Sequence, residues 1–291
     1  MNALKDAIGL NSSEFEDRVI LELGSGTGIF SMLIARAGAK HVYAWEPSSI
    51  SEISKEIIKA NKLDNIITVL NCPIADIKIP GKVDVVFTSA FGISFYLDSF
   101  LPQFLFARDN YLKENGILLP QLAEFSLSTA IKSRYGRPES FWDDVYGFDF
   151  TPIKDNSFDE PYMYFVSPQM IKSEISIFQP LDFNTLSINN LNVKHSFTIK
   201  CNEEHEVSSF VFWFKVIFNN NVIFDTSPYK DQTHFCQIIF DIKEPFQVKE
   251  GDIISGTISI NLNDNKTRPI FYKIKYTINK SEEIKQIFVL Q

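Results

Sequence analysis

The hydrophobic period of the chain changes near Pro120, and this change limits the folds open to it. Before Pro120, short apolar runs such as Val19–Leu23 alternate with segments of helical spacing. Strands that alternate with helices form βαβ units and a doubly wound parallel sheet. Later segments such as Ile253–Ile260 alternate polar and apolar residues with period two, which is typical of antiparallel strands in a barrel or sandwich. We therefore expect two domains of different class, residues 1–120 and residues 121–291.

The composition excludes several classes of protein. Hydrophobic residues make up 45% of the chain and charged residues 22%, which is ordinary for a globular protein and unlike a disordered one. The formal net charge of −8 argues against direct nucleic-acid binding and favours a cationic macromolecular partner. The three cysteines are far apart and include no Cys-x-x-Cys, so neither a disulfide framework nor a metal site is indicated. Neither a signal peptide nor a membrane span is visible, so we expect a cytoplasmic or nuclear protein without membrane attachment.

A glycine-rich loop, Gly24-Ser-Gly-Thr-Gly28, follows the first apolar run. Glycines at a strand-to-helix turn let the backbone turn sharply and approach a ligand closely. Glu46 ends the second predicted strand, where a carboxylate can accept both ribose hydroxyls of a nucleotide cofactor. Glu22 lies within the first strand, and a buried carboxylate there needs a partner such as the α-amino group of an amino-acid cofactor.

The spacing of the glycines differs from the Gly-x-Gly-x-x-Gly dinucleotide fingerprint, because the third glycine comes one residue early. Together with the two glutamates, this spacing favours S-adenosylmethionine or S-adenosylhomocysteine over NAD. The alternative is a tight turn that persists for folding without a ligand. The predicted cofactor-binding residues of this loop and its flanking strands are Glu22, Gly24, Ser25, Gly26, Gly28 and Glu46.

Longer motifs make the sequence resemble the protein arginine methyltransferases. The matching stretches cover nearly the whole chain and are residues 19–28, 37–46, 83–87, 107–113, 116–120, 142–149, 225–228 and 233–235. The resemblance implies a class I S-adenosylmethionine-dependent methyltransferase (Rossmann-like) domain followed by a β-barrel domain. It also implies a helical dimerisation arm inserted in the barrel, here at about 148–180, which would dock on a partner's cofactor domain.

The family pattern breaks in the loop after the fourth predicted strand. Family members hold the substrate guanidinium there with two glutamates nine residues apart, through charge-assisted bidentate hydrogen bonds. This chain has Ser89 at the first position and Asp98 at the second. One carboxylate is absent and the other is set back by about 1 Å, a displacement that can reduce a rate on the order of 10²-fold. Asp98 and His234, in the family's Thr-His-Trp motif that reads Thr-His-Phe here, are the remaining catalytic candidates.

Two further departures concern the cofactor. The family's adenine-binding acid follows an aliphatic residue after the third strand, but Ile74 is followed by Ala75 here, so the adjacent Asp76 would have to substitute. Only about 18 residues precede Val19, and we expect the two N-terminal helices that cover the cofactor in the family to be largely missing.

Three functions remain open from the sequence. The first is a pseudoenzyme or prozyme subunit, inactive or weakly active alone, that pairs with an active arginine methyltransferase paralogue as a hetero-oligomer, or with itself through the arm. Basic Arg/Gly-rich proteins would then be its indirect substrates. The second is a divergent active arginine N-methyltransferase, and the third is a methyltransferase of another substrate class.

Overall fold

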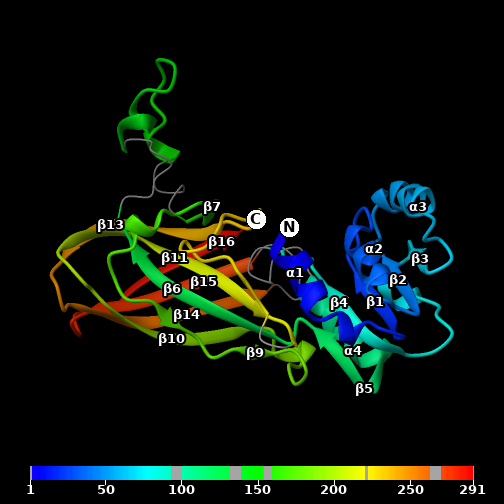
Figure 1. Ribbon diagram of the computed structural model, residues 1–291. Coiled ribbons are helices and arrows are strands. Elements are labelled where there is room, and N and C mark those ends of the chain that lie inside the picture. Colours follow the sequence, from blue (N-terminus) through cyan, green and yellow to red (C-terminus); the bar gives the residue numbers. More distant parts are fainter. Residues whose placement is uncertain are drawn as a thin grey trace. The chain divides into compact units, whose positions relative to one another are not determined.

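The protein divides into two compact units in a computed structural model, which describes residues 2–92, 100–131, 139–153, 159–219, 222–262 and 270–290. Unit 1 comprises Met1–Ala123, Leu181–Asn189 and Val216–Phe224, and unit 2 comprises Glu124–Pro180, Asn190–Lys215 and Asp225–Gln291. Figure 1 labels most of the α-helices and β-strands of the two units.

Unit 1 contains a parallel sheet of order β3-β2-β1-β4-β5. Its strands are β1 (Val19–Leu23), β2 (His41–Trp45), β3 (Ile67–Leu70), β4 (Val83–Thr88) and β5 (Leu112–Leu119). Its α-helices are α1 (Asn2–Leu10), α2 (Ile29–Arg36), α3 (Ile50–Ala60) and α4 (Phe100–Tyr111), with short 3-10 turns η1 (Ser12–Glu14) and η2 (Ile74–Asp76). The strand order reverses between β1 and β4, and ligands of such sheets bind where the carboxyl ends meet this switch point.

Two segments from late in the sequence also belong to unit 1. In the second of them, the rings of Phe218 and Phe224 pack on Phe91, with ring centroids 6.3 and 5.8 Å apart. Phe218 also stacks on Phe87 of β4 at 6.4 Å. Phe183 of the first segment meets Phe104 of α4 edge to face at 5.6 Å. These aromatic contacts extend the apolar core of unit 1 beyond its βαβ elements.

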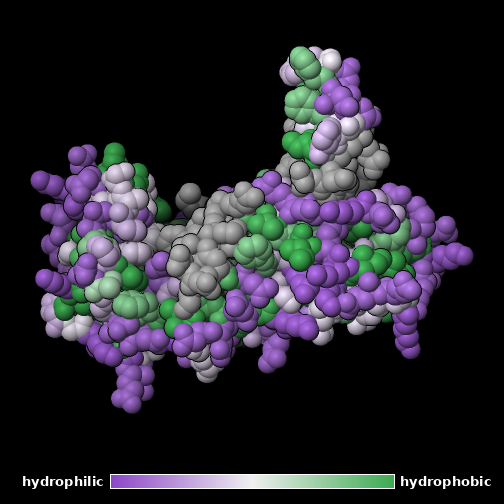
Figure 2. Space-filling view, turned by 180° about the vertical axis from the view of Figure 1, so that it is seen from behind, coloured by the Kyte–Doolittle hydropathy of each residue, from purple (hydrophilic) through white to green (hydrophobic). Residues whose placement is uncertain are grey.

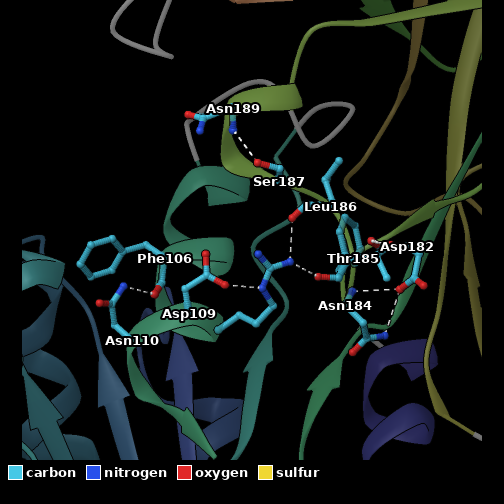
Figure 3. Close-up of polar contacts among 11 residues, drawn as sticks. Phe106, Asp109, Asn110, Asp182, Asn184, Thr185, Leu186, Ser187 and Asn189 are labelled. Atoms are coloured by element: carbon cyan, nitrogen blue, oxygen red, sulfur yellow. Dashed lines mark hydrogen bonds and ion pairs between the residues drawn. The ribbon is translucent and has the colours of Figure 1, made fainter. Parts of the chain in front are cut away.

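Arg108 of α4 fixes the first returning segment by hydrogen bonds. Its guanidinium Nη1 donates to the carbonyl oxygens of Phe183 at 2.6 Å and Leu186 at 2.7 Å, while Nε donates to the Asp109 carboxylate at 2.7 Å (Figure 3). A guanidinium offers several donors in a fixed plane and can therefore satisfy carbonyls and a carboxylate at once. Residues 181–189 are thus tied to α4 by the Arg108 hydrogen bonds as well as by the ring contact of Phe183 with Phe104.

Unit 2 is built from two antiparallel sheets. The seven-stranded sheet includes β7 (Tyr162–Tyr164), β13 (Gln237–Val248), β11 (His205–Ile217), β6 (Leu122–Ala130) and β8 (Ser176–Ile177), with β9 (Leu181–Asp182) and β12 (Ile223–Asp225) paired to it. The four-stranded sheet is β10 (Val193–Lys200), β14 (Ile253–Leu262), β15 (Ile270–Ile278) and β16 (Ile284–Leu290). The predicted fold class, a Rossmann-like domain followed by a β-barrel domain, is confirmed.

One strand of unit 2 departs from the expected alternation of buried and exposed residues. The consecutive residues 209–214 of β11 are all buried. On one face, Val211 and Trp213 form an apolar cluster with Ala130, Val166 and Ile239. On the other face, Phe210 and Phe212 contact other aromatic rings. Because both faces of β11 are covered, its sequence needs apolar side chains at odd and even positions alike.

The range expected to hold the arm contains several kinds of structure. In its described part, β7 and β8 pair with β13 and β6 of the seven-stranded sheet. Residues 139–153 form two 3-10 turns, η3 (Glu139–Asp143) and η4 (Thr151–Ile153), joined by the hydrogen bond from Phe150 N to Trp142 O at 2.9 Å. The extent of the arm stays a prediction.

The surface carries exposed apolar side chains in both units. Figure 2 shows such residues as small patches among a larger hydrophilic area. The most exposed is Tyr146 at 98%, followed in the same segment by Phe148 at 69%. Among the described residues, no helix has the length and apolar character that a membrane crossing requires.

Candidate functional site

The glycine loop connects β1 to α2 at the carboxyl edge of the parallel sheet. Gly24, Gly26 and Gly28 have φ angles of 68°, 56° and 83°, in the left-handed region where a Cβ atom is unfavourable. The N–H groups of Gly24 and Ser25 donate to Trp45 O at 2.9 and 3.1 Å. The loop is therefore tied to the end of β2, which carries Glu46.

Glu46 is almost buried and its carboxylate is held by two backbone groups. Gly26 N donates to Oε2 and Ser48 N donates to Oε1, both at 2.9 Å. The structure thus brings the predicted ribose-binding acid against the middle glycine of the loop. Asn71 supports this turn from the end of β3, because its Nδ2 donates to the carbonyl oxygens of Glu46 at 2.9 Å and Ser48 at 3.0 Å.

Glu22 is fully buried in β1 and only partly satisfied. The Ser31 hydroxyl donates a hydrogen bond to its Oε2, whereas Oε1 has no hydrogen-bond partner in the described part of the chain. Burial raises the pKa of Glu22 to about 7, and the neighbouring charge of Glu46 acts in the same direction. A cationic donor that met Oε1 would satisfy this oxygen and stabilise the carboxylate form.

The residues present fit S-adenosylmethionine. Besides Glu22 Oε1, the buried hydroxyl of Ser25 has no partner among the described residues. Both atoms could therefore form hydrogen bonds with a ligand. A Cβ atom on Gly26 would meet nothing within 4 Å, whereas one on Gly28 would lie 2.9 Å from Ser54 Oγ. Gly26 therefore borders open space and Gly28 packs on α3. The cofactor, when bound, supplies a methyl group on a sulfonium.

The turn expected to meet the adenine ring is η2. Ile74 is half-buried and Asp76 is exposed. The Tyr111 hydroxyl at the end of α4 donates to Ile74 O at 2.6 Å, and Trp45 Nε1 donates to Cys72 O at 2.8 Å. These contacts link η2 to α4 and β2. The sequence reasoning missed Ser31, Asn71 and Tyr111, because they act through contacts across strands that no local motif signals.

The end of β4 is neutral where the family carries its first catalytic glutamate. Thr88 is buried, and its hydroxyl donates to Leu23 O and accepts from Ala90 N, each at 3.1 Å. Ser89, between them, is half-buried and offers one hydroxyl. Asp98, the second predicted position, lies outside the described residues.

The predicted motif of unit 2 lies beside a pocket of about 230 Å³. Thr226, Ser227, Thr233, Phe235 and Gln237 contribute to its lining. Gln237 closes the turn from within, since its Nε2 donates to Thr226 O at 2.7 Å and its Oε1 accepts from Val166 N at 2.8 Å.

His234 is exposed and its ring lies 3.9 Å, between centroids, from that of Phe235. Partial burial of the imidazole ring lowers the pKa of His234. Its predicted catalytic role, like that of Asp98, stays a prediction. Within the described residues, no group of three or more His, Cys, Asp or Glu side chains is arranged to hold a metal ion.

Comparison with known proteins decides the family. A family model for the arginine methyltransferase oligomerization subdomain matches residues 127–282. Protein arginine N-methyltransferase 1 of Schizosaccharomyces pombe is 35% identical over 283 residues, covering 96% of this chain and 83% of that protein. The chain belongs to the protein arginine N-methyltransferase family. Protein arginine N-methyltransferase 1 of Caenorhabditis elegans is 33% identical over 281 residues, covering 94% of this chain and 80% of that protein.

Solved structures of the family are also similar. A chain of the Trypanosoma brucei PRMT1 enzyme–prozyme heterotetrameric complex with AdoHcy matches with a TM-score of 0.93 and 26% identity, covering 100% of this chain and 94% of that one. Arabidopsis thaliana protein arginine methyltransferase 10 matches with a TM-score of 0.88 and 24% identity, over the same shares, and this likeness concerns the fold. The family's oligomerisation subdomain and its S-adenosylmethionine domain are thus both represented in this chain.

Proposed function

We propose that this chain is a prozyme-type subunit that binds S-adenosylmethionine or S-adenosylhomocysteine, has little activity alone, and assembles with an active arginine methyltransferase paralogue. The observation that carries the proposal is the neutral end of β4. Ser89 offers a hydroxyl where the family resemblance expects a carboxylate, and its neighbours Thr88 and Ala90 supply no charge. A guanidinium held there would lack one of its two counter-charges.

Cofactor binding is supported by the carboxylates that remain at the glycine loop, in contrast to the neutral end of β4. Glu22 and Glu46 both remain, and the loop between them keeps the left-handed glycine conformations and unpartnered polar atoms described above. A chain that had lost the cofactor would be under no constraint to keep a buried carboxylate whose pKa is raised to about 7. We therefore assign the cofactor role to Glu22, Gly24, Ser25, Gly26, Gly28 and Glu46, with Ile74 and Asp76 on the adenine side.

Assembly is supported by the exposed apolar side chains of residues 139–153. Tyr146 and Phe148 are more exposed than apolar side chains usually are, and Phe150 and Ile153 in the same segment are exposed by 40 and 42%. The oligomerization subdomain of the family model includes this segment. We propose that this segment, which overlaps the start of the predicted arm at about 148–180, meets a partner, in the cytoplasm or the nucleus, and that Arg/Gly-rich proteins are substrates of the complex.

A divergent but active arginine methyltransferase is the second candidate. It is favoured by the similarity to relatives named protein arginine N-methyltransferase 1, at up to 35% identity over most of the chain. Asp98 and His234 would then serve as the catalytic pair.

The two candidates are separated by measuring methyl transfer to an Arg-Gly peptide. The purified chain is assayed alone, the active paralogue alone, and the two after co-expression. We expect the chain alone to be near background, the two to co-purify, and the complex to exceed the paralogue alone. Transfer by this chain alone at a rate of an ordinary enzyme, about 1 s⁻¹ or more, would establish the second candidate instead.

The assembly step has its own control. Phe148→Asp is expected to abolish co-purification, while Ile284→Asp, at an exposed apolar position of β16, is expected to leave it intact. Equal loss in both variants would contradict the role of segment 139–153. Calorimetry with S-adenosylhomocysteine on each variant shows whether unit 1 is still folded.

A further inference from the structure

The outer face of the four-stranded sheet concentrates positive charge in a protein whose net charge is −8. In the register of β10, β14, β15 and β16, alternate residues of each strand share this face. Five of them are lysines that lie partly or fully exposed, and we call them the lysine face. They are Lys194, Lys200, Lys273, Lys275 and Lys285.

Four of the lysines lie close together in the sheet register, whereas Lys200 lies toward the opposite end of β10. Lys275 of β15 is directly opposite Lys285 of β16, and Lys273 is separated from Lys194 by Ser259 alone. Like charges directly opposite one another destabilise a sheet. The pair of Lys275 and Lys285 therefore carries a local electrostatic cost that a bound anion would reduce.

The protein supplies little compensation of its own. Glu283 forms an ion pair with Lys275, with 2.6 Å between Lys275 Nζ and Glu283 Oε1. The hydrogen bond from Lys275 lowers the pKa of Glu283, and the charges of Lys275, Lys273 and Lys194 add to this effect. In the part of the chain that the structure describes, Lys194, Lys200, Lys273 and Lys285 have no ion pair. Glu283 is thus paired with Lys275 and is also influenced by the charges of Lys273 and Lys194.

We propose that the lysine face binds an extended, acidic segment of a partner protein. Carboxylates on alternate residues of an extended chain are about 7 Å apart, the same spacing as Lys273 and Lys275 along β15, while neighbouring strands add rows about 5 Å apart. Ser196, Thr257 and Ser259 lie between the lysines and offer hydroxyl donors to carboxylates. This partner differs in charge from the basic substrates of the proposed function.

The same face is poorly suited to single-stranded nucleic acid. Sequence-tolerant binding of that kind relies on several aromatic side chains on which bases stack. Among the described outward positions of this sheet, Phe271 is the single aromatic residue. The acidic remainder of the chain also repels a long polyanion more than it repels a short peptide.

The test measures binding of a fluorescein-labelled peptide of alternating Glu and Ser by anisotropy, on the full chain. The face variant carries Lys194→Glu, Lys273→Glu and Lys285→Glu. The control variant carries Lys59→Glu, Lys78→Glu and Lys82→Glu, three exposed lysines of unit 1, and changes the net charge equally. Oligouridylate and a peptide with Gln in place of Glu are the comparison ligands, and far-UV circular dichroism checks the fold of both variants.

We expect the face variant to lose at least tenfold in affinity for the acidic peptide and the control variant to change less than twofold. The Gln peptide should bind at least tenfold more weakly than the Glu peptide, and added salt should weaken binding. Equal losses in both variants would overturn the proposal, because charge alone rather than this face would decide binding. Tighter binding of oligouridylate than of the acidic peptide would overturn the choice of partner.

Discussion

Two regions at the same edge of the parallel sheet differ in what they offer a ligand. The carboxyl ends of β1 and β2 carry Glu22 and Glu46. Glu22 Oε1 has no hydrogen-bond partner among the described residues, whereas the Glu46 carboxylate accepts a hydrogen bond from the glycine loop. The end of β4, directly beside β1, carries only the hydroxyls of Thr88 and Ser89. If the proposed function holds, cofactor binding and substrate activation are separable within one sheet, because each would depend on carboxylates at different strand ends.

The largest effect is expected from restoring charge at the end of β4. The double variant Ser89→Glu with Asp98→Glu supplies both carboxylates of the family pattern, and we expect methyl transfer to rise by about 10²-fold or more. The measurement is single-turnover transfer to an Arg-Gly peptide. The matched control is Ser89→Gln with Asp98→Glu, which has the same shape without the first charge. An equal rise in the control would break the comparison, since size rather than charge would then limit the rate.

Removing the buried carboxylate of Glu22, at the end of β1, should weaken binding of the cofactor. Glu22→Gln keeps the shape of the side chain but removes the anion that, in the proposed role, meets the cofactor's amino group. We expect affinity for S-adenosylhomocysteine to fall about 10- to 100-fold, equivalent to about 1.4–3 kcal/mol. Titration calorimetry measures this loss. An unchanged affinity would show that Glu22 is structural.

The raised pKa of Glu22 predicts how stability depends on pH. The folded protein holds this proton up to about pH 7, whereas the unfolded chain releases it near the ordinary carboxyl pKa of 4.5. The contribution of Glu22 to the free energy of unfolding therefore falls as pH rises from about 4.5 to 7, by up to about 3 kcal/mol, and is flat above that range. Ligand-free Glu22→Gln should lose this dependence and melt higher than wild type at pH 8, by differential scanning fluorimetry.

The same proton makes cofactor affinity depend on pH. If the cationic amino group binds the carboxylate form of Glu22 as proposed, affinity for S-adenosylhomocysteine should rise with pH up to about 7 and level off above it. The Glu22→Gln variant should show a flat profile over this range.

Two neighbouring glycines can separate loop folding from ligand approach. Gly26→Ala and Gly28→Ala share the strain of a positive φ, but only the second places a Cβ 2.9 Å from Ser54 Oγ. We expect Gly28→Ala to lower the free energy of unfolding by about 1–3 kcal/mol. Gly26→Ala should cost less stability and reduce cofactor affinity more. Urea unfolding and calorimetry give the two values, and the reverse order would contradict the assignment of Gly26 to the ligand side.

The smallest effect is expected at the adenine side. Tyr111→Phe removes the hydrogen bond to Ile74 O at 2.6 Å without changing the ring. Because this bond holds η2 rather than the ligand itself, affinity for S-adenosylhomocysteine should fall by about threefold or less, in keeping with about 0.5 kcal/mol for one partly exposed hydrogen bond. A loss as large as that of Glu22→Gln would move the main recognition from the glycine loop to η2.

Local pattern was enough for most strands and helices of unit 1, but it did not predict β5, where the helix was expected to continue to Leu112. The apolar run of Val19–Leu23 became β1 and the glycine loop follows it, because a strand buried on both faces must be continuously apolar and the turn after it needs left-handed residues. The place of Glu46 at the end of β2 followed from the same reasoning. What could not be predicted was its bond to Gly26 N, since residues 20 positions apart meet only when β1 and β2 pair.

The sequence by itself determined the two periodicities, the glycine loop, the family and the neutral residue at Ser89, because each is a local pattern or a residue identity. Only the tertiary structure decided which atoms those residues meet. It placed Phe183 and Phe218 in unit 1, covered both faces of β11, and buried Glu22 Oε1 without a partner among the described residues. It also placed five lysines from three strands on one face. Contacts between distant segments depend on packing that no window of the sequence contains.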